Sequence, residues 1–177
     1  MAAPITPTKK LSNGKDHYWL VTTLSSLTSP SAAEINAGLN VTGVLLADWD
    51  GITASTSKVT LPRVMIETST TEVNGETTIT AADMQVTFQP QAAALSDGVK
   101  AFELLSAGFT GYLVRRQDVA NTTSDAVTAA QFVDIFGIDV TAGSVIPGKT
   151  TSGPDGIYIF TAPPSVTSAA FRKVVAA

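Results

Sequence analysis

Residues 143 to 150, GSVIPGKT, match the loop that binds phosphate in many nucleotide hydrolases. In that loop the backbone amides and the lysine hold the phosphates, and a helix must begin at the Lys-Ser/Thr pair. Here the chain continues as TSGPDG, in which Gly153, Pro154 and Gly156 disfavour a helix. No strand-helix-strand unit follows. We therefore predict that residues 147–156 form a loop between two strands and that the chain binds no nucleotide.

Other residues with reactive side chains are few and isolated. His17 is the only histidine, no Gly-x-Ser-x-Gly elbow is present, and we interpret His17 as an edge or interface residue. Asp48 and Asp50 form the only close acidic pair, but they offer too few oxygen ligands for a calcium loop, so we expect a turn with Trp49 packed inward. The chain has no cysteine, which excludes disulfides and thiolate metal sites. The sequence predicts no catalytic residue, no metal site and no cofactor.

The composition favours a protein that packs against copies of itself. Only 15% of the 177 residues are charged and 44% are hydrophobic, so much of the surface is uncharged and repels other copies weakly. The net charge of −4 argues against a dedicated nucleic-acid-binding module, which usually has a basic face. No signal-peptide pattern and no apolar run of about 20 residues are present, so we expect a soluble protein made in the cytoplasm.

The order of patterned segments predicts a mainly β fold. A stripe of Leu95, Val99, Phe102 and Leu105 predicts one helix over 95–108, and a shorter helical signal at 28–38 has Ser31 and Glu34 placed for a capping box. Strands are expected at 17–24, 41–46, 57–68, 78–90, 111–117, 131–146, 156–162 and 171–175. We predict an antiparallel β-sandwich or barrel with one flanking α-helix, as a single domain over 17–177 preceded by an extended arm over 1–16.

Two segments have patterns with structural consequences. Segment 78–90 alternates, which puts Met84, Val86 and Phe88 on a core face and Asp83, Gln85 and Thr87 on the opposite face. Segment 69–78 is polar and contains Asn74-Gly75, a strong hairpin signal, so we expect a loop there. Arg115 and Arg116 follow a strand, where we expect intersubunit salt bridges, with phosphate contacts as the alternative.

Several stretches, taken in order, resemble the major tail protein, or tail tube protein, of long-tailed non-contractile bacteriophages. They are PITPTKKLSNGK, SPSAAEINAG followed by VTGVLLADWDGI, DGVKAFELLSAGFTGYLVRR, FVDIFGIDV and GIYIFTAPPSV. The resemblance covers most of the chain and is a pattern of elements rather than a catalytic fingerprint. AEINAG and the helix that leads into GYLVRR are its most specific parts.

The resemblance implies a structural virion protein that forms hexameric rings stacked into a tube. Genome DNA would pass through this tube without specific binding, and the partners would be further copies of the chain, the tape-measure protein, the tail terminator and tail-tip proteins. Its place would be the tail of the virion, after synthesis in the host cytoplasm. An acidic or neutral lumen wall would not bind the phosphates of the DNA. The outer face of segment 82–88 is suited to line the lumen through Asp83, Gln85 and Thr87. Contacts between rings are expected from the arm and the polar loop, through Lys9, Lys10, Glu72, Asn74 and Glu76.

Three alternatives to this role are open. A secretion-system tube protein has a related fold, and a capsid decoration or adhesin-like β-module would act as a monomer or trimer. A small enzyme is the third, and the failed motifs above count against it.

Overall fold

The computed structural model describes residues 16–46, 49, 51–60, 72–91, 96–117, 126–151 and 156–177, and it is mainly β as predicted. All strand pairs within the three sheets are antiparallel. The elements are β1 (His17–Val21), α1 (Ala32–Ala37), β2 (Leu39–Asn40), β3 (Ile52–Thr60), β4 (Glu72–Ala81), β5 (Met84–Thr87), α2 (Asp97–Ser106), β6 (Phe109–Arg116), β7 (Phe132–Val140), β8 (Ile146–Lys149), β9 (Tyr158–Ala162) and β10 (Ser165–Val174).

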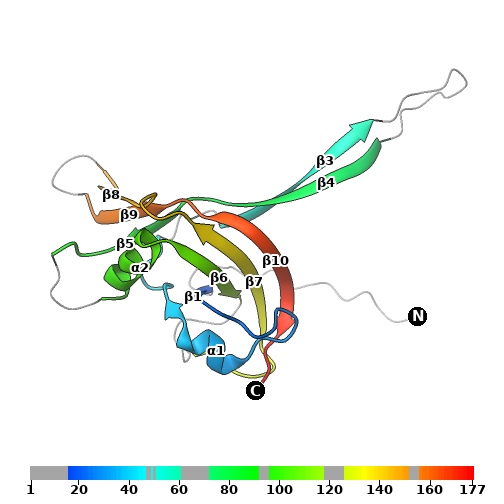
Figure 1. The fold of residues 1–177 in the computed structure, drawn as a ribbon, viewed down its shortest axis with the longest axis horizontal. Helices are drawn as coiled ribbons and strands as arrows, with labels where there is room; N and C mark the ends of the chain where they lie inside the picture. The colour runs from blue at the N-terminus through cyan, green and yellow to red at the C-terminus, as the bar shows by residue number, and fades with distance from the viewer. Residues whose placement is uncertain are drawn as a thin grey trace, which may run out of the picture.

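A curved five-stranded sheet in the order β10-β7-β6-β1-β2 forms the centre of the body (Figure 1). On one face, Leu20, Leu113 and Phe136 belong to a core shared with α2 and with the small sheet β5-β9-β8. On the other face, Trp19, Val114 and Ile135 belong to a second core, closed by Ile35 of α1. Both faces of the central strands are therefore buried, as in a layered sandwich. No sheet closes into a barrel in the part of the chain that the structure describes.

Helix α2 confirms the stripe predicted for 95–108. Leu105 is buried, Val99 and Phe102 are partly buried, and Leu95 lies outside the described residues. The helix ends before Gly108, whose φ of +95° favours glycine. Near its start the backbone approaches β5 closely, since a Cβ on Gly98 would lie 2.1 Å from the carbonyl oxygen of Thr87. Glycine at this position lets α2 lie against the small sheet.

Helix α1 has the capping box that its sequence predicts. The Ser31 hydroxyl accepts a hydrogen bond from the Ala33 amide at 3.2 Å, and the Glu34 carboxylate accepts one from the Ser31 amide at 3.2 Å. The Ser25 amide also donates to Glu34, at 3.1 Å. Hydrogen bonds from Ser25 and then Ser31 hold the pKa of Glu34 below its ordinary value.

The strand predicted at 41–46 is wrong. Residues 42–44 form a turn, and only Leu45 makes an isolated bridge, to Val86. The Asn40 side chain accepts a hydrogen bond from the Thr42 amide at 2.9 Å, and the Leu45 amide donates to the Val41 carbonyl at 2.9 Å. These local bonds hold 42–44 in a turn, and the segment joins β5 only at its end, where the Leu46 amide donates to the Gln85 carbonyl and the Thr87 amide donates to the Val44 carbonyl.

Other strand boundaries differ from the sequence prediction. The long strand expected at 131–146 is β7 alone, followed by a turn in which Gly143 has a φ of +77°. The loop expected at 147–156 begins instead as strand β8, which pairs with β9 through Ile146–Lys149. The last strand is longer than predicted, because Ser165–Val174 all belong to β10.

Candidate assembly surfaces

Strands β3 and β4 project from the body as a two-stranded ribbon. We call it the β3–β4 arm, which is distinct from the extended segment expected over 1–16. Figure 1 shows no other described element beside its outer part. Side chains 53–58 and 74–78 are exposed. Threonine hydroxyls pair across the strands, Thr53 with Thr80 at 3.1 Å and Thr56 with Thr77 at 2.9 Å. β-branched threonine suits a strand that has water on both faces. Over 53–58 and 74–78 the β3–β4 arm therefore has antiparallel backbone pairing without a core of its own.

The hairpin turn predicted at Asn74-Gly75 is wrong. Asn74 lies within β4 and pairs with Lys58, next to a register shift between Thr56 and Lys58. The Asn-Gly pair lies at this irregularity and not at a turn. β3 and β4 pair on both sides of it, from Ile52 with Ala81 to Thr60 with Glu72. The connection between β3 and β4 falls in 61–71, outside the described residues.

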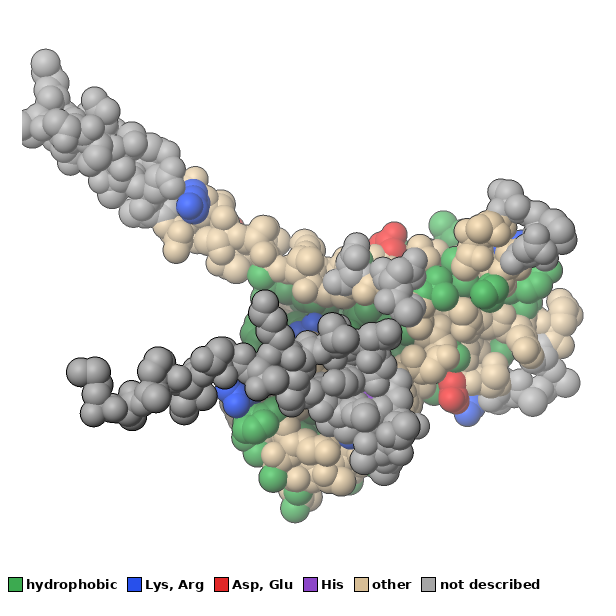
Figure 2. Space-filling model, turned by 180° about the vertical axis from the view of Figure 1, so that it is seen from behind, with side chains coloured by type: hydrophobic (Ala, Val, Ile, Leu, Met, Phe, Trp, Pro, Cys, Tyr) green, Lys and Arg blue, Asp and Glu red, His purple; other side chains and the backbone are tan. Residues whose placement is uncertain are grey.

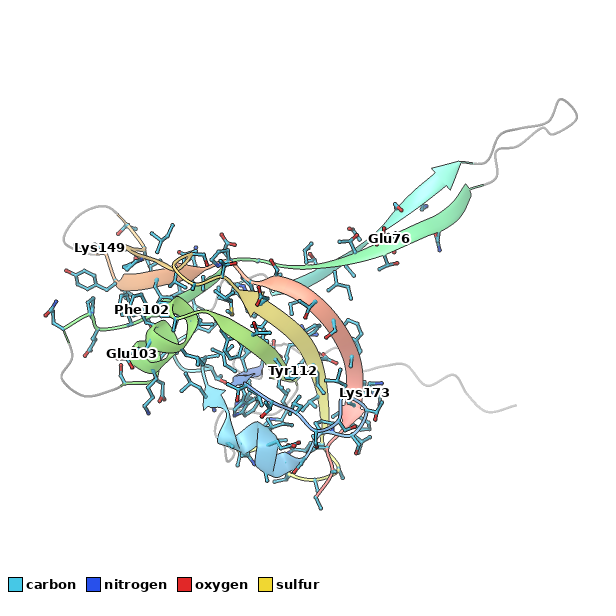
Figure 3. The ribbon with its side chains drawn as sticks, in the orientation of Figure 1. Glu76, Phe102, Glu103, Tyr112, Lys149 and Lys173 are labelled. Carbon is cyan, nitrogen blue, oxygen red and sulfur yellow. The ribbon has the colours of Figure 1, made fainter. Side chains whose placement is uncertain are left out.

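The residues predicted to contact the next ring thus lie on this arm or outside the described chain. Glu76 is exposed on β4 (Figure 3), and Glu72 pairs with Thr60 at the outer end of the arm. Lys9 and Lys10 lie outside the described residues. Their predicted inter-ring contacts stay predictions.

The single strand predicted over 78–90 is wrong, because the chain leaves β4 at Ala81 and begins β5, in another sheet, at Met84, but the alternation predicted at β5 is confirmed. Met84 and Val86 are buried in the main core, whereas Asp83 and Gln85 are exposed. Thr87 is partly buried, and its hydroxyl donates to the Val44 carbonyl at 3.0 Å. The register β5-β9-β8 puts Gln85, Thr161 and Ile146 in one row across the outer face of the small sheet. Whether this face lines a lumen stays a prediction.

Arg115 binds a carboxylate of its own chain. It donates to Asp134 from Nη2 at 2.7 Å and from Nε at 3.2 Å, across the β6–β7 pair. Burial is the largest influence on nearby Tyr18 and raises its pKa. The other Asp134 oxygen accepts the Arg172 backbone amide at 2.8 Å, at a bulge in β10. One carboxylate thus joins β6, β7 and β10.

Arg116 is buried on the opposite face of the sheet, with 1% of its surface exposed. It donates to the Ala126 carbonyl at 2.8 Å and to the Gln131 side chain at 3.2 Å, and it lies over the Trp19 ring. His17 is also buried and stacks on Trp19, with ring centroids 5.8 Å apart. The intersubunit bridges predicted for Arg115 and Arg116 stay predictions, and within the chain both guanidinium groups have partners.

Sequence reasoning missed two apolar surfaces. Among the described residues, the exposed large hydrophobic side chains are Phe132 of β7 with Phe171 and Val174 of the neighbouring β10, and Ile146, Ile157 and Tyr158 at the β8–β9 hairpin. Hydrophobic side chains gather at the β8–β9 end in Figure 2. We call Phe132, Phe171, Arg172 and Val174 the β10 surface.

On the face of the β8–β9 hairpin that carries Tyr158, opposite to the face of Ile146, a groove of about 570 Å³ lies beside α2. We call it the α2–β8 groove, and its lining includes Phe88, Pro90, Phe102, Glu103, Pro147, Lys149 and Tyr158. The sequence signal for it was the aromatic content of 88, 102 and 158, but tertiary packing decides that these rings meet. Phe88 and Phe102 stack with centroids 5.1 Å apart.

The phosphate-loop match has the wrong structure around it. Residues 146–149 form strand β8, and no helix begins at Lys149-Thr150. Within the described ranges no three His, Asp or Glu side chains come together as a metal site. The same described residues contain no helix with the length and apolar character needed to cross a membrane. Asp48 and Asp50 lie outside them, but Trp49 packs against the core and donates to the Ala82 carbonyl at 3.1 Å.

An antiparallel β-protein with a projecting arm and two separate apolar surfaces is of the class that assembles with other protein chains. The family model described as phage tail tube protein matches residues 3–177. The chain therefore belongs to the phage tail tube protein family, a structural family without enzymatic activity, and it is a component of the virion tail. A comparison with curated proteins found no match.

Proposed function

We propose that this chain forms hexameric rings that stack into the tail tube of a long-tailed, non-contractile phage, and that the double-stranded genome passes through it. The family supports self-assembly into a tube. The weakly charged composition supports close packing of many copies, because a net charge of −4 on 177 residues gives little mutual repulsion. The body over 17–177 would be the ring-forming unit.

The β3–β4 arm is the observation that carries the stacking part of this proposal. A two-stranded ribbon without a core is marginally stable in water, and this one has exposed side chains along both strands. Packing against a second copy would bury it. We therefore place the contact between successive rings on the arm, including Asn74 and Glu76, with Lys9 and Lys10 of the 1–16 segment contributing to the same contact.

The outer face of β5 is our candidate for the lumen. Asp83 and Gln85 are exposed there, and an acidic or neutral wall does not hold DNA phosphates. Asp83→Lys should leave tube assembly unchanged and slow DNA passage, measured as the rate of genome release from assembled phage. Asp97→Lys makes the same charge change on α2 and serves as the control. Unchanged release in Asp83→Lys phage would remove β5 from the lumen.

The first experiment is electron microscopy of the purified chain, held concentrated for days, beside its mass in solution. Hollow rings or tubes of uniform width are the expected result. A small closed oligomer without a channel would contradict the proposal and favour a decoration module. In the phage, we expect the tape-measure protein inside the tube during assembly and the terminator and tail-tip proteins at its ends, after synthesis in the host cytoplasm.

A further inference from the structure

The β10 surface and the α2–β8 groove lie on opposite sides of the subunit. In Figure 3, Lys173 of β10 lies on one side of the body, and Phe102, Glu103 and Lys149 lie on the other. One subunit cannot bring the two together. Two different surfaces on opposite sides of identical copies form a head-to-tail contact, which generates rings when the rotation closes.

The β10 surface has a shape that the fold holds in place. Arg172 has a φ of +49°, in the left-handed region, which is strained for a non-glycine residue. Its amide is held by Asp134 at 2.8 Å, and its guanidinium lies 4.8 Å from the centre of the Phe132 ring. The Phe171 ring meets Phe136 edge-on, with centroids 5.5 Å apart. These contacts present Phe132 and Phe171 as exposed rings in a fixed position.

The groove on the other side is complementary in chemistry. Its rings and prolines give it an apolar lining, and Glu103 is the only acidic residue among those that line it. Lys149 is also present, but its ammonium lies over the Tyr158 ring, 5.0 Å from the centroid. The β10 surface has a basic residue, Arg172, and Lys173 follows it in the chain. An apolar contact flanked by Arg172 and Glu103 would thus pair opposite charges.

We infer that the β10 surface of one copy packs into the α2–β8 groove of the neighbouring copy, with Arg172 beside Glu103, and that this contact repeats around each ring. The inference rests on the proposed ring assembly and names the surfaces that form it. The arm, which projects away from the body, remains available for the next ring.

A mixing experiment tests the head-to-tail contact. Of the two surfaces, Phe171→Asp alters the β10 surface and Tyr158→Asp alters the groove, and both side chains are about half exposed, at 52% and 50%. Each variant alone should remain an 18.3 kDa monomer at concentrations about 30-fold above those at which the wild-type chain assembles. A 1:1 mixture should give heterodimers and nothing larger, because each pair retains one intact contact. Thr128→Asp, an exposed site on the 126–131 turn, is the matched control and should assemble like the wild-type chain.

The absence of native cysteine provides a second measurement that does not depend on the aspartate variants folding well. Glu103→Cys and Arg172→Cys should not cross-link alone under mild oxidation, should form dimers when mixed, and should form a ladder of oligomers when combined in one chain. Self-dimers of either single variant, or no cross-link in the mixture, would overturn the inference. Wild-type rings that persist in both aspartate variants would also overturn it while leaving the tube proposal intact. A wild-type chain that forms a closed oligomer without a channel would instead defeat the tube proposal.

Discussion

Two antiparallel strand pairs of equal length differ in how far their side chains are buried. β3 and β4 have 9 and 10 residues, as do β7 and β10. In the first pair the exposed positions are mostly Ser and Thr, whereas β7 buries Val133, Ile135, Phe136 and Ile138. Backbone pairing is therefore common to both, and the buried side chains of β7 separate them, since those of β10 are exposed or partly buried. The contrast indicates that β7–β10 stabilises the subunit and that the arm contributes little until it meets another copy.

The largest effect on stability should come from Phe136. Its ring is 1% exposed and contacts Phe171, so Phe136→Ala removes a buried ring and leaves a cavity. We expect a loss of about 3–5 kcal/mol in the free energy of unfolding, measured with urea. Thr56→Ala in the arm is the control and should cost about 0.2–1 kcal/mol. Equal losses from the two variants would remove the contrast.

Asp134 should come next, because it joins three strands of the central sheet. Asp134→Ala removes the acceptor of both Arg115 and the Arg172 amide, and we expect a loss of about 1.5–3 kcal/mol. Asp134→Asn keeps one oxygen for the Arg172 amide and should lose less. An equal loss in the two variants would show that the bulge does not depend on this acceptor.

Removing the arm should affect stability less than either substitution. Ala54 pairs directly with Ile79, so replacing residues 55–78 with Asn-Gly joins two paired strand ends by a two-residue turn. We expect the free energy of unfolding to change by no more than about 1 kcal/mol, since the excised described side chains are exposed. Rings should still form but should not stack, as seen by electron microscopy. Normal tubes from this variant would move the stacking contact away from the arm.

The smallest effect should appear at Glu34, which belongs to neither pair. Its pKa is lowered in the folded chain from 4.5, so its ionised form stabilises the fold above that value. The stabilisation is lost as the pH falls through the lowered pKa. The urea midpoint of the wild-type chain should therefore fall more steeply between about pH 5 and pH 3 than that of Glu34→Gln. Parallel curves would show that hydrogen bonding alone, without charge, completes the cap.

The sequence predicted those elements whose determinants are local. The capping box of Ser31 and Glu34, the stripe of α2 and the alternation of Met84 and Val86 all depend on spacing along one segment. Prediction failed where another interaction outweighed the local pattern. The Asn40 side chain holds the Thr42 amide, and 42–44 forms a turn instead of a strand. Pairing with β3 keeps Asn74-Gly75 extended instead of in a turn.

The assembly surfaces were harder to foresee for a different reason. SVTSAAF in β10 has no clear alternation, so the strand was recognised only at its apolar end. The exposure of Phe132 and Phe171 depends on which elements stop short of covering them, and no pattern within either segment carries that information. The resemblance predicted the family, but the position of these rings required the structure.

The two register shifts in β10 give the subunit a built-in bend. Between Val166 and Ser168, and again between Ala170 and Lys173, β10 contains one residue more than the strand it pairs with. Because the longer strand β10 is hydrogen-bonded along its length to the shorter strand β7, the pair must bend. At Gly137 the strands approach so closely that a Cβ would lie 2.3 Å from the Ser168 hydroxyl. The curvature of the sheet thus depends on the number of residues in β10 more than on their types. Substitutions in the core would change the stability of the bend. A single-residue deletion in β10 would change the radius of the bend by a discrete step.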